Sequence, residues 1–192
     1  MKIVINKSNE LTKLIERCKR GERKAQKSLY ERYSDKMLAI CCRYVGAKQE
    51  AEDIMISGFM KVFEKLDQFN QDGSIEGWIR KLMINECLMH IRKYKSVQLV
   101  SESNIESENF KVAQVCNYDS DKILSLVQQL PTGYRTVFNM YAIDGYTHKE
   151  ISGEIGISEN TSKSQLCKAR NLLKKYLYEL ELEQPKSLRN YE

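Results

Sequence analysis

Apolar residues recur every three or four positions through most of this 192-residue chain, with one long lapse from residue 96 to residue 118. A repeat near 3.6 residues places such residues on one face of an α-helix, which must then pack against other helices. Nine glycines and two prolines are too few for a turn-rich β fold. The pattern therefore predicts an all-α fold.

The lapse in periodicity sets the expected domain boundaries. Four amphipathic segments precede it, so residues 1–95 are expected to share one core. Residues 96–118 are polar, weakly acidic and aperiodic, which is typical of a flexible linker. Periodicity then returns, so residues 119–183 are expected to form a second small helical domain, and residues 184–192 a tail.

Charge is distributed unevenly along the chain. The net charge of +5 is too small to name a partner. Residues 1–47, however, carry twelve Lys and Arg and only five Asp and Glu. Residues 80–95 carry five Lys and Arg with one acidic residue, and residues 163–175 carry five Lys and Arg with no acidic residue. The two short basic blocks, separated by acidic stretches, indicate two separate contacts with anionic partners. No partner is assigned to the basic excess of residues 1–47.

Targeting segments, membrane spans and metal sites are not expected. No stretch approaches roughly 18 consecutive apolar residues, and charge follows the first apolar residues too soon for a signal peptide, so we expect a cytoplasmic protein without membrane contact. The six cysteines contain no Cys-x-x-Cys pair and are expected to behave as small buried hydrophobes. Cys87 and His90 could offer two metal ligands, but a structural zinc ion needs four. We therefore expect no metal and no cofactor.

An enzymatic function is the least favoured class. The chain has two histidines, no glycine-rich phosphate loop and no pairing of a nucleophile with a base. His148 is expected to be a solvated residue in the first turn of a helix.

The most specific motif begins at Thr147. This residue can cap a helix with Glu150 as its reciprocal partner, Gly156 permits the positive φ of a tight turn, and Ser158 can cap a second, basic helix. A short helix, a glycine turn and a longer basic helix form the geometry that enters a DNA major groove. The candidate DNA-binding residues are Ser158, Glu159, Asn160, Thr161, Lys163, Ser164, Gln165, Lys168 and Arg170. The alternative is an ordinary helical hairpin with a solvated face. The two helix caps, and the five Lys and Arg without any Asp or Glu in residues 163–175, disfavour it.

Segments on both sides of the linker resemble one family of proteins. ILSLVQQLPTGYRTVF (residues 123–138) and the helix-turn-helix after it resemble region 4 of bacterial sigma factors. AEDIMISGFMKVFEKLDQF (residues 51–69) and GWIRKLMINECLMHIRK (residues 77–93) resemble region 2. The two regions occur in order with only a linker between them, which is the layout of the extracytoplasmic-function (ECF) subgroup.

The resemblance implies a transcription initiation factor that binds core RNA polymerase and promoter DNA. Region 2 would dock on the polymerase and read and melt the −10 element, while region 4 would read the −35 element. The expected polymerase-binding residues are Asp53, Ile56, Ser57 and Met60, with Ile56 and Ser57 standing where Gln and an acidic residue are usual. The expected −10 residues are Arg80, Lys81, Asn85, Arg92 and Lys93. The resemblance also allows for an anti-sigma factor as a partner.

One departure from the family pattern bears on base recognition. Gln165 replaces a common Arg, and Gln prefers adenine where Arg prefers guanine, so we predict an altered base preference there.

Two other functions remain open from the residues alone. A stand-alone helix-turn-helix regulator would use its N-terminal helices to dimerise and would bind a palindromic site without polymerase. A helical inhibitor or mimic that has lost DNA contact is disfavoured by the five basic side chains of residues 163–175.

Overall fold

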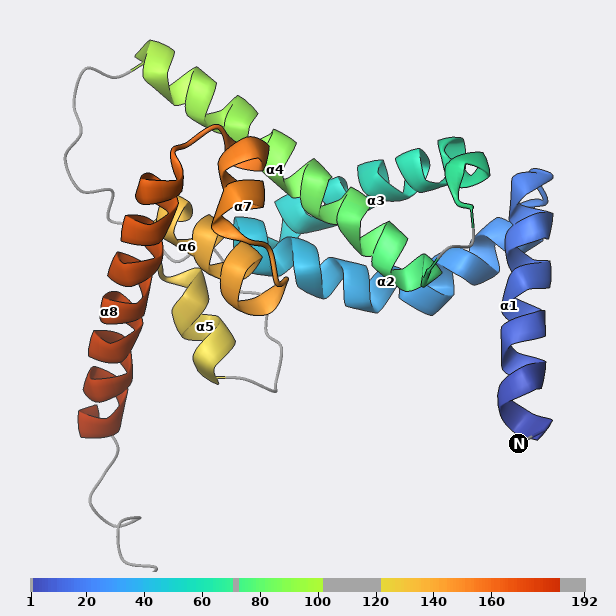
Figure 1. Cartoon of the computed structure of the whole chain (residues 1–192), viewed down its shortest axis with the longest axis horizontal. Coiled ribbons are helices and arrows are strands. Elements are labelled where there is room, and N and C mark those ends of the chain that lie inside the picture. The colour runs from blue at the N-terminus through green and yellow to red at the C-terminus, as the bar shows by residue number, and fades with distance from the viewer. Residues whose placement is uncertain (1, 71–72, 102–121, 184–192) are drawn as a thin grey trace, which may run out of the picture. The chain divides into compact units, whose positions relative to one another are not determined.

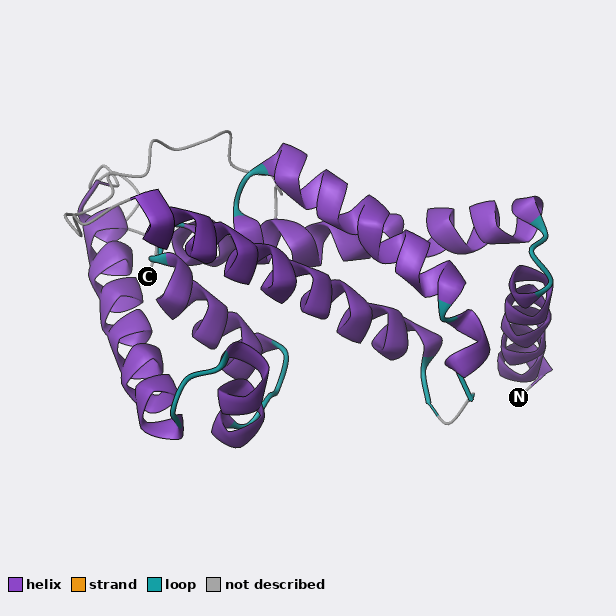
Figure 2. Cartoon of the chain, turned by 90° about the horizontal axis from the view of Figure 1, so that it is seen from above, coloured by secondary structure: helices purple, strands orange, loops and turns teal. Residues whose placement is uncertain are grey.

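The computed structural model describes residues 2–70, 73–101 and 122–183. These residues form helices joined by short turns and contain no strand, which confirms the all-α prediction (Figure 2). The chain divides into an N-terminal unit (residues 1–42 and 47–107) and a C-terminal unit (residues 43–46 and 108–192). Most of the predicted linker and the predicted tail lie outside the described residues. Within the described part, no helix is long and apolar enough to cross a membrane.

The N-terminal unit is built on four helices (Figure 1). They are α1 (Lys2–Lys19), α2 (Arg23–Val45), α3 (Lys48–Glu64) and α4 (Ile75–Ser101), with a 3-10 turn η1 (Leu66–Gln68) after α3. Gly21, with a φ of 75°, lies in the turn that follows the first helix. The helix α4 continues to Ser101, six residues beyond the predicted end of the domain at residue 95.

Helices α3 and α4 pack antiparallel at close range. Glu50 lies 3.7 Å from His90 near one end of the pair, and the Nζ atom of Lys61 donates to Glu86 at 2.7 Å nearer the other. Gly58 approaches α4 so closely that an added Cβ atom would overlap the buried Met83 side chain. The face of α3 turned to the core carries Ala51, Ile54, Met55, Gly58, Phe59 and Val62.

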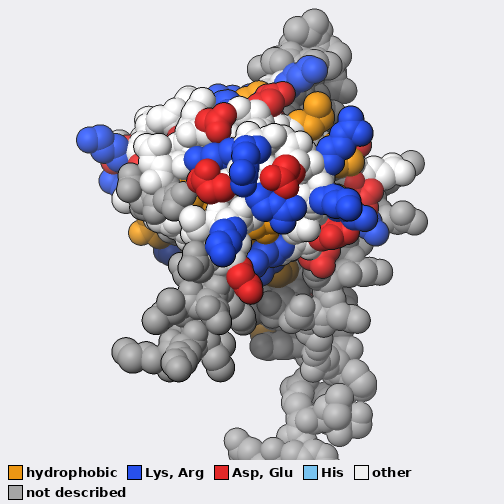
Figure 3. Space-filling model, turned by 90° about the vertical axis from the view of Figure 1, so that its right-hand side faces the viewer, with side chains coloured by type: hydrophobic (Ala, Val, Ile, Leu, Met, Phe, Trp, Pro, Cys, Tyr) orange, Lys and Arg blue, Asp and Glu red, His pale blue; other side chains and the backbone are white. Residues whose placement is uncertain are grey.

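Part of the basic excess in residues 1–47 is used inside the N-terminal unit. The Nζ atom of Lys36 binds the Glu76 carboxylate at 2.9 Å, and that of Lys19 donates to the carbonyl of Phe69 at 3.3 Å. Lys19 thereby ties α1 to the residue after η1, and Lys36 ties α2 to the first turn of α4. On the face that includes α1, Lys and Arg are mixed with Asp and Glu, so it is not a uniform basic patch (Figure 3).

The C-terminal unit packs three short helices against one long helix. It contains α5 (Lys122–Gln128), α6 (Thr132–Phe138), a wide π-helical turn η2 (Asn139–Ile143), α7 (His148–Ile155) and α8 (Glu159–Glu183). Leu126, Val127 and Leu130 form a core with Ala169 and Leu173 of α8. This core attaches α8 to the helices that precede it.

Three of the cysteines confirm the prediction of buried apolar residues. Cys18, Cys41 and Cys87 are buried free thiols, and burial raises the pKa of the Cys18 thiol above its ordinary value. Two others depart from the prediction: Cys167 is exposed on α8, and Cys42 is disulfide-bonded.

A pair of glycine substitutions tests the packing of α3 on α4. Gly58→Ala should lower the free energy of unfolding by about 1–3 kcal/mol, because the new methyl group overlaps Met83 in a filled core. Gly153→Ala in α7 is the control: open space surrounds that position, so it should raise stability by roughly 0.5–1 kcal/mol. Urea unfolding followed by circular dichroism measures both. Stabilisation by Gly58→Ala would contradict the close approach.

Candidate nucleic-acid interface

Reciprocal capping begins the helix-turn-helix. The Thr147 hydroxyl accepts a hydrogen bond from the Glu150 backbone N–H at 3.2 Å, and the Glu150 carboxylate accepts from the Thr147 N–H at 2.8 Å. Gly156 ends α7 in the left-handed conformation with φ 70°. Both features confirm the local structure predicted for this motif, since each satisfies helix-end groups that would otherwise lack partners.

Two serines hold the turn and the start of α8. The Ser152 hydroxyl donates to the Ile157 carbonyl at 2.6 Å, across the turn between the two helices. The Ser158 hydroxyl accepts from the Thr161 backbone N–H at 3.0 Å, so Ser158 caps α8 as predicted. The angle between α7 and α8 is thus supported by side-chain bonds as well as by the glycine.

The buried face of α8 decides which residues it presents outward. Ser162, Leu166, Ala169 and Leu173 are buried at helical spacing. Eight of the nine predicted DNA-binding residues are exposed around the rest of the helix and its cap: Ser158, Glu159, Asn160, Thr161, Lys163, Ser164, Lys168 and Arg170. The structure therefore brings these eight side chains to the surface of one element.

Gln165 is placed differently from the other eight. Its half-buried side chain lies against Gly133 in the first turn of α6. Its Oε1 atom is buried, and no hydrogen-bond partner for it is found among the described residues. A direct base contact from Gln165 would require the side chain to turn away from α6.

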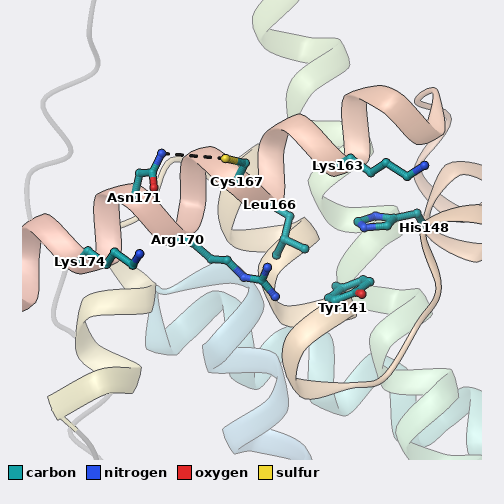
Figure 4. A pocket seen from close by; sticks show the side chains of 8 residues that line it. All are labelled: Tyr141, His148, Lys163, Leu166, Cys167, Arg170, Asn171 and Lys174. Atoms are coloured by element: carbon teal, nitrogen blue, oxygen red, sulfur yellow. Dashed lines mark hydrogen bonds between the residues drawn. The ribbon is translucent and has the colours of Figure 1, made fainter.

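An open pocket of about 370 Å³ lies along one flank of α8 (Figure 4). Its lining residues are Tyr141, His148, Lys163, Leu166, Cys167, Arg170, Asn171 and Lys174. They include three permanent cations and no carboxylate. Six of the eight, namely Tyr141, His148, Leu166, Cys167, Asn171 and Lys174, are not among the predicted site residues.

His148 is fixed in this pocket, so the prediction of a solvated histidine is wrong. Its ring stacks on that of Tyr141 with centroids 4.5 Å apart, and its Nδ1 atom lies 2.9 Å from the hydroxyl of buried Ser162. The Arg170 guanidinium lies 5.9 Å from the Tyr141 ring centroid. Tyr141 comes from the π-helical turn η2, which the regular helical period of the sequence does not reveal.

The predicted −10 residues all lie on α4. Lys81, Arg92 and Lys93 are exposed, whereas Arg80 and Asn85 are half-buried. The Oδ1 atom of Asn85 is buried, and the described residues supply no hydrogen-bond partner for it. An unsatisfied buried acceptor of this kind is uncommon in native structures.

The four predicted polymerase-binding residues share one exposed face of α3. Asp53, Ile56, Ser57 and Met60 have the i, i+3, i+4, i+7 spacing of a single helix face, and all four are exposed. Ile56 is 51% exposed and Met60 61%, so two large apolar side chains stand side by side in solvent. Exposed apolar pairs bordered by polar groups are typical of protein-binding surfaces.

Comparison with known proteins identifies the two halves of the chain. Residues 29–97 match the family profile described as Sigma-70 region 2, and residues 120–173 match that described as Sigma-70, region 4. The first profile spans α3 and most of α4, and the second spans the helix-turn-helix and its supporting helices.

Curated relatives align over nearly their whole length. The ECF RNA polymerase sigma factor SigW of Bacillus subtilis is 26% identical over 187 residues, covering 88% of this chain and 98% of the relative. The RNA polymerase sigma-H factor of Pseudomonas aeruginosa is 25% identical over 182 residues, covering 87% and 93%.

A solved structure supports the fold. The sigma factor RpoE in complex with the anti-sigma factor NepR from Bartonella quintana aligns with a TM-score of 0.51 at 23% identity, covering 79% of this chain and 96% of that one. With both regions present in order on an all-helical fold, this chain belongs to the sigma-70 family of RNA polymerase sigma factors, in its ECF group.

Proposed function

We propose that this chain binds core RNA polymerase and directs it to promoters to start transcription. The observation that carries the proposal is the presence of sigma regions 2 and 4 in order in one chain. A stand-alone regulator is not supported, because region 2 occupies the part of the chain which that alternative leaves for dimerisation. The proposed site of action is the cytoplasm, since the partners are polymerase and promoter DNA.

In this proposal α8 reads the −35 element. Its capped N-terminus and its exposed polar residues have the form that a recognition helix needs in the major groove. The firm packing of α7 and of the α8 core supports this role, because a rigid helix presents its side chains to base edges at defined positions.

The −10 element is assigned to α4. Exposed Lys81, Arg92 and Lys93 suit the phosphates of a melted strand. The Oδ1 atom of Asn85 lacks a partner but is buried, so the side chain would have to turn outward to form a hydrogen bond with a displaced base. Capture of unpaired bases offsets the stacking energy lost on melting, so strand opening needs no ATP chemistry in this chain.

The exposed face of α3 is assigned to polymerase docking. Ile56 and Met60 supply apolar contact area, and the border residues Asp53 and Ser57 supply polar contacts. This chain carries Ile56 and Ser57 where family members commonly carry a Gln and an acidic residue. Its binding to polymerase would therefore depend more on burial of apolar surface.

An anti-sigma factor is a further proposed partner. The solved sigma factor RpoE with the same fold is bound to the anti-sigma factor NepR. We extend this type of control to the present chain.

Transcription in vitro tests the proposed function directly. Purified core polymerase, with and without the chain, is supplied with genomic fragments from the source organism. We expect discrete transcripts only when the chain is present. Absence of any chain-dependent transcript contradicts the proposal, whereas DNA binding without polymerase at a palindromic site favours the stand-alone regulator.

Met60→Glu should weaken binding to core polymerase by roughly tenfold or more, because burial of the new carboxylate in an apolar contact costs more than about 1.4 kcal/mol. Met89→Glu on α4 is the control, since Met89 is also an exposed helical methionine, at 49%. Fluorescence anisotropy of labelled chain titrated with core polymerase measures both affinities. Equal affinities of the Met60→Glu variant and the unmodified chain contradict docking through this face.

Asn85→Ala should separate function from stability. Removal of an unsatisfied buried acceptor should leave the free energy of unfolding unchanged or raise it by up to about 1 kcal/mol. Open-complex formation, measured by permanganate reactivity of unpaired thymines, should fall because the displaced base loses its partner. Unchanged permanganate reactivity would exclude a base contact by Asn85.

A further inference from the structure

We propose that Lys61, on the polymerase-docking helix α3, is a positioning residue for strand capture by α4, because it neutralises the Glu86 carboxylate beside Asn85. The inference rests on the proposed function, in which α4 binds the melted strand of the −10 element. It gives a side chain of α3 a part in DNA opening, exerted through Glu86 rather than by contact with the DNA.

Glu86 is an exception in charge on the helix that carries it. Residues 80–95 contain five Lys and Arg, and Glu86 is their only acidic residue. It directly follows Asn85, so the Cα atoms of the two residues lie about 3.8 Å apart. A carboxylate left without a cation at this position would repel the phosphates that the basic residues attract.

The packing of α3 on α4 brings Lys61 to this carboxylate. The Nζ atom of Lys61 donates to the Oε1 atom of Glu86 at 2.7 Å. The Cγ atom of Glu86 lies 3.7 Å from the place that a Cβ atom on Gly58 would take. The Glu86 side chain therefore passes Gly58 and meets Lys61 about one turn further along α3.

Burial makes Lys61 the main source of neutralisation for Glu86. The Glu86 side chain is 12% exposed and that of Lys61 is 34% exposed. Because little water reaches the carboxylate, solvent and salt screen its charge less than they screen an exposed ion pair. Lys48 and Glu52, near the start of the same helix, form such a pair at 3.8 Å, and both side chains are more exposed.

Asn85 lies next to this ion pair and must move when it binds a base. Its Oδ1 atom is buried, with no hydrogen-bond partner among the described residues, so the side chain has to turn outward. The contact between Lys61 and Glu86 ties the adjacent position of α4 to α3. The movement can then be confined to the Asn85 side chain, beside a carboxylate whose charge is already balanced.

Charge-removing variants test this role in the complete holoenzyme. Lys61→Gln keeps a hydrogen-bond donor beside Glu86 but removes the positive charge. We expect open-complex formation, measured by permanganate reactivity of unpaired thymines, to fall by about fivefold or more, because like charges then face each other across the interface. The double variant Lys61→Gln with Glu86→Gln should restore it to near the unmodified level, since no unbalanced charge remains.

Lys48→Gln is the matched control, because it removes the same charge from the same helix and leaves Glu86 paired. Each holoenzyme is assembled at a chain concentration that saturates core polymerase, so a change in docking affinity does not enter the comparison. Circular dichroism verifies that each variant is folded. The double variant leaves no buried charge unpaired, so it remains a valid test if Lys61→Gln lowers stability.

Three results overturn the proposal. An equal fall for Lys61→Gln and for the double variant shows that Lys61 acts through packing rather than through charge. Unchanged opening by the Lys61→Gln holoenzyme shows that Glu86 needs no neutralisation. An equal fall for Lys48→Gln shows that any loss of positive charge on α3 has the same effect.

The outcomes separate this inference from the proposed function. Failure of the unmodified holoenzyme to open any promoter fragment contradicts both. Normal opening that is insensitive to Lys61→Gln contradicts the role of Lys61 alone.

Discussion

Burial of one face of α8 determines what the C-terminal unit can offer to a partner. Ser162, Leu166, Ala169 and Leu173 hold the helix against its neighbours, and this contact fixes its rotation about its own axis. Every other side chain on the helix takes its direction from that rotation. One side then presents small polar groups and Lys168 to solvent, while another presents the cations of the pocket to Tyr141 and His148.

In the N-terminal unit, too, packing of one helix face determines which side chains the opposite face exposes. Close packing of α3 on α4, permitted by Gly58, buries one face of α3 and leaves the opposite face exposed. The exposed face carries Ile56 and Met60, whose burial would be favourable only in a complex. Lys19 and Lys36 contact the turn and the first residues of α4, so the basic N-terminal segment supports the helix to which the −10 element is assigned.

Local physics made part of the structure predictable from sequence. The helices, the Thr147–Glu150 capping box and the left-handed Gly156 depend on residues close in sequence, and all were predicted. The π-helical turn was not, because a single extra residue in a helical turn leaves no clear periodic signal. The stack of His148 on Tyr141 and the contact of Gln165 with Gly133 join separate elements, and so required the fold itself. Helix α4 extends to Ser101, past residue 95, where the regular apolar repeat of the sequence ends.

The central claim is that one chain, bound to one polymerase, reads two promoter elements through two helical units. Transcription from promoters in which the spacing of these elements is altered tests it most directly. Inserting about five base pairs rotates one element by roughly half a helical turn relative to the other. We predict that this insertion abolishes transcription by the holoenzyme while each element keeps its sequence. Transcription that is indifferent to the insertion would contradict simultaneous reading of the two elements.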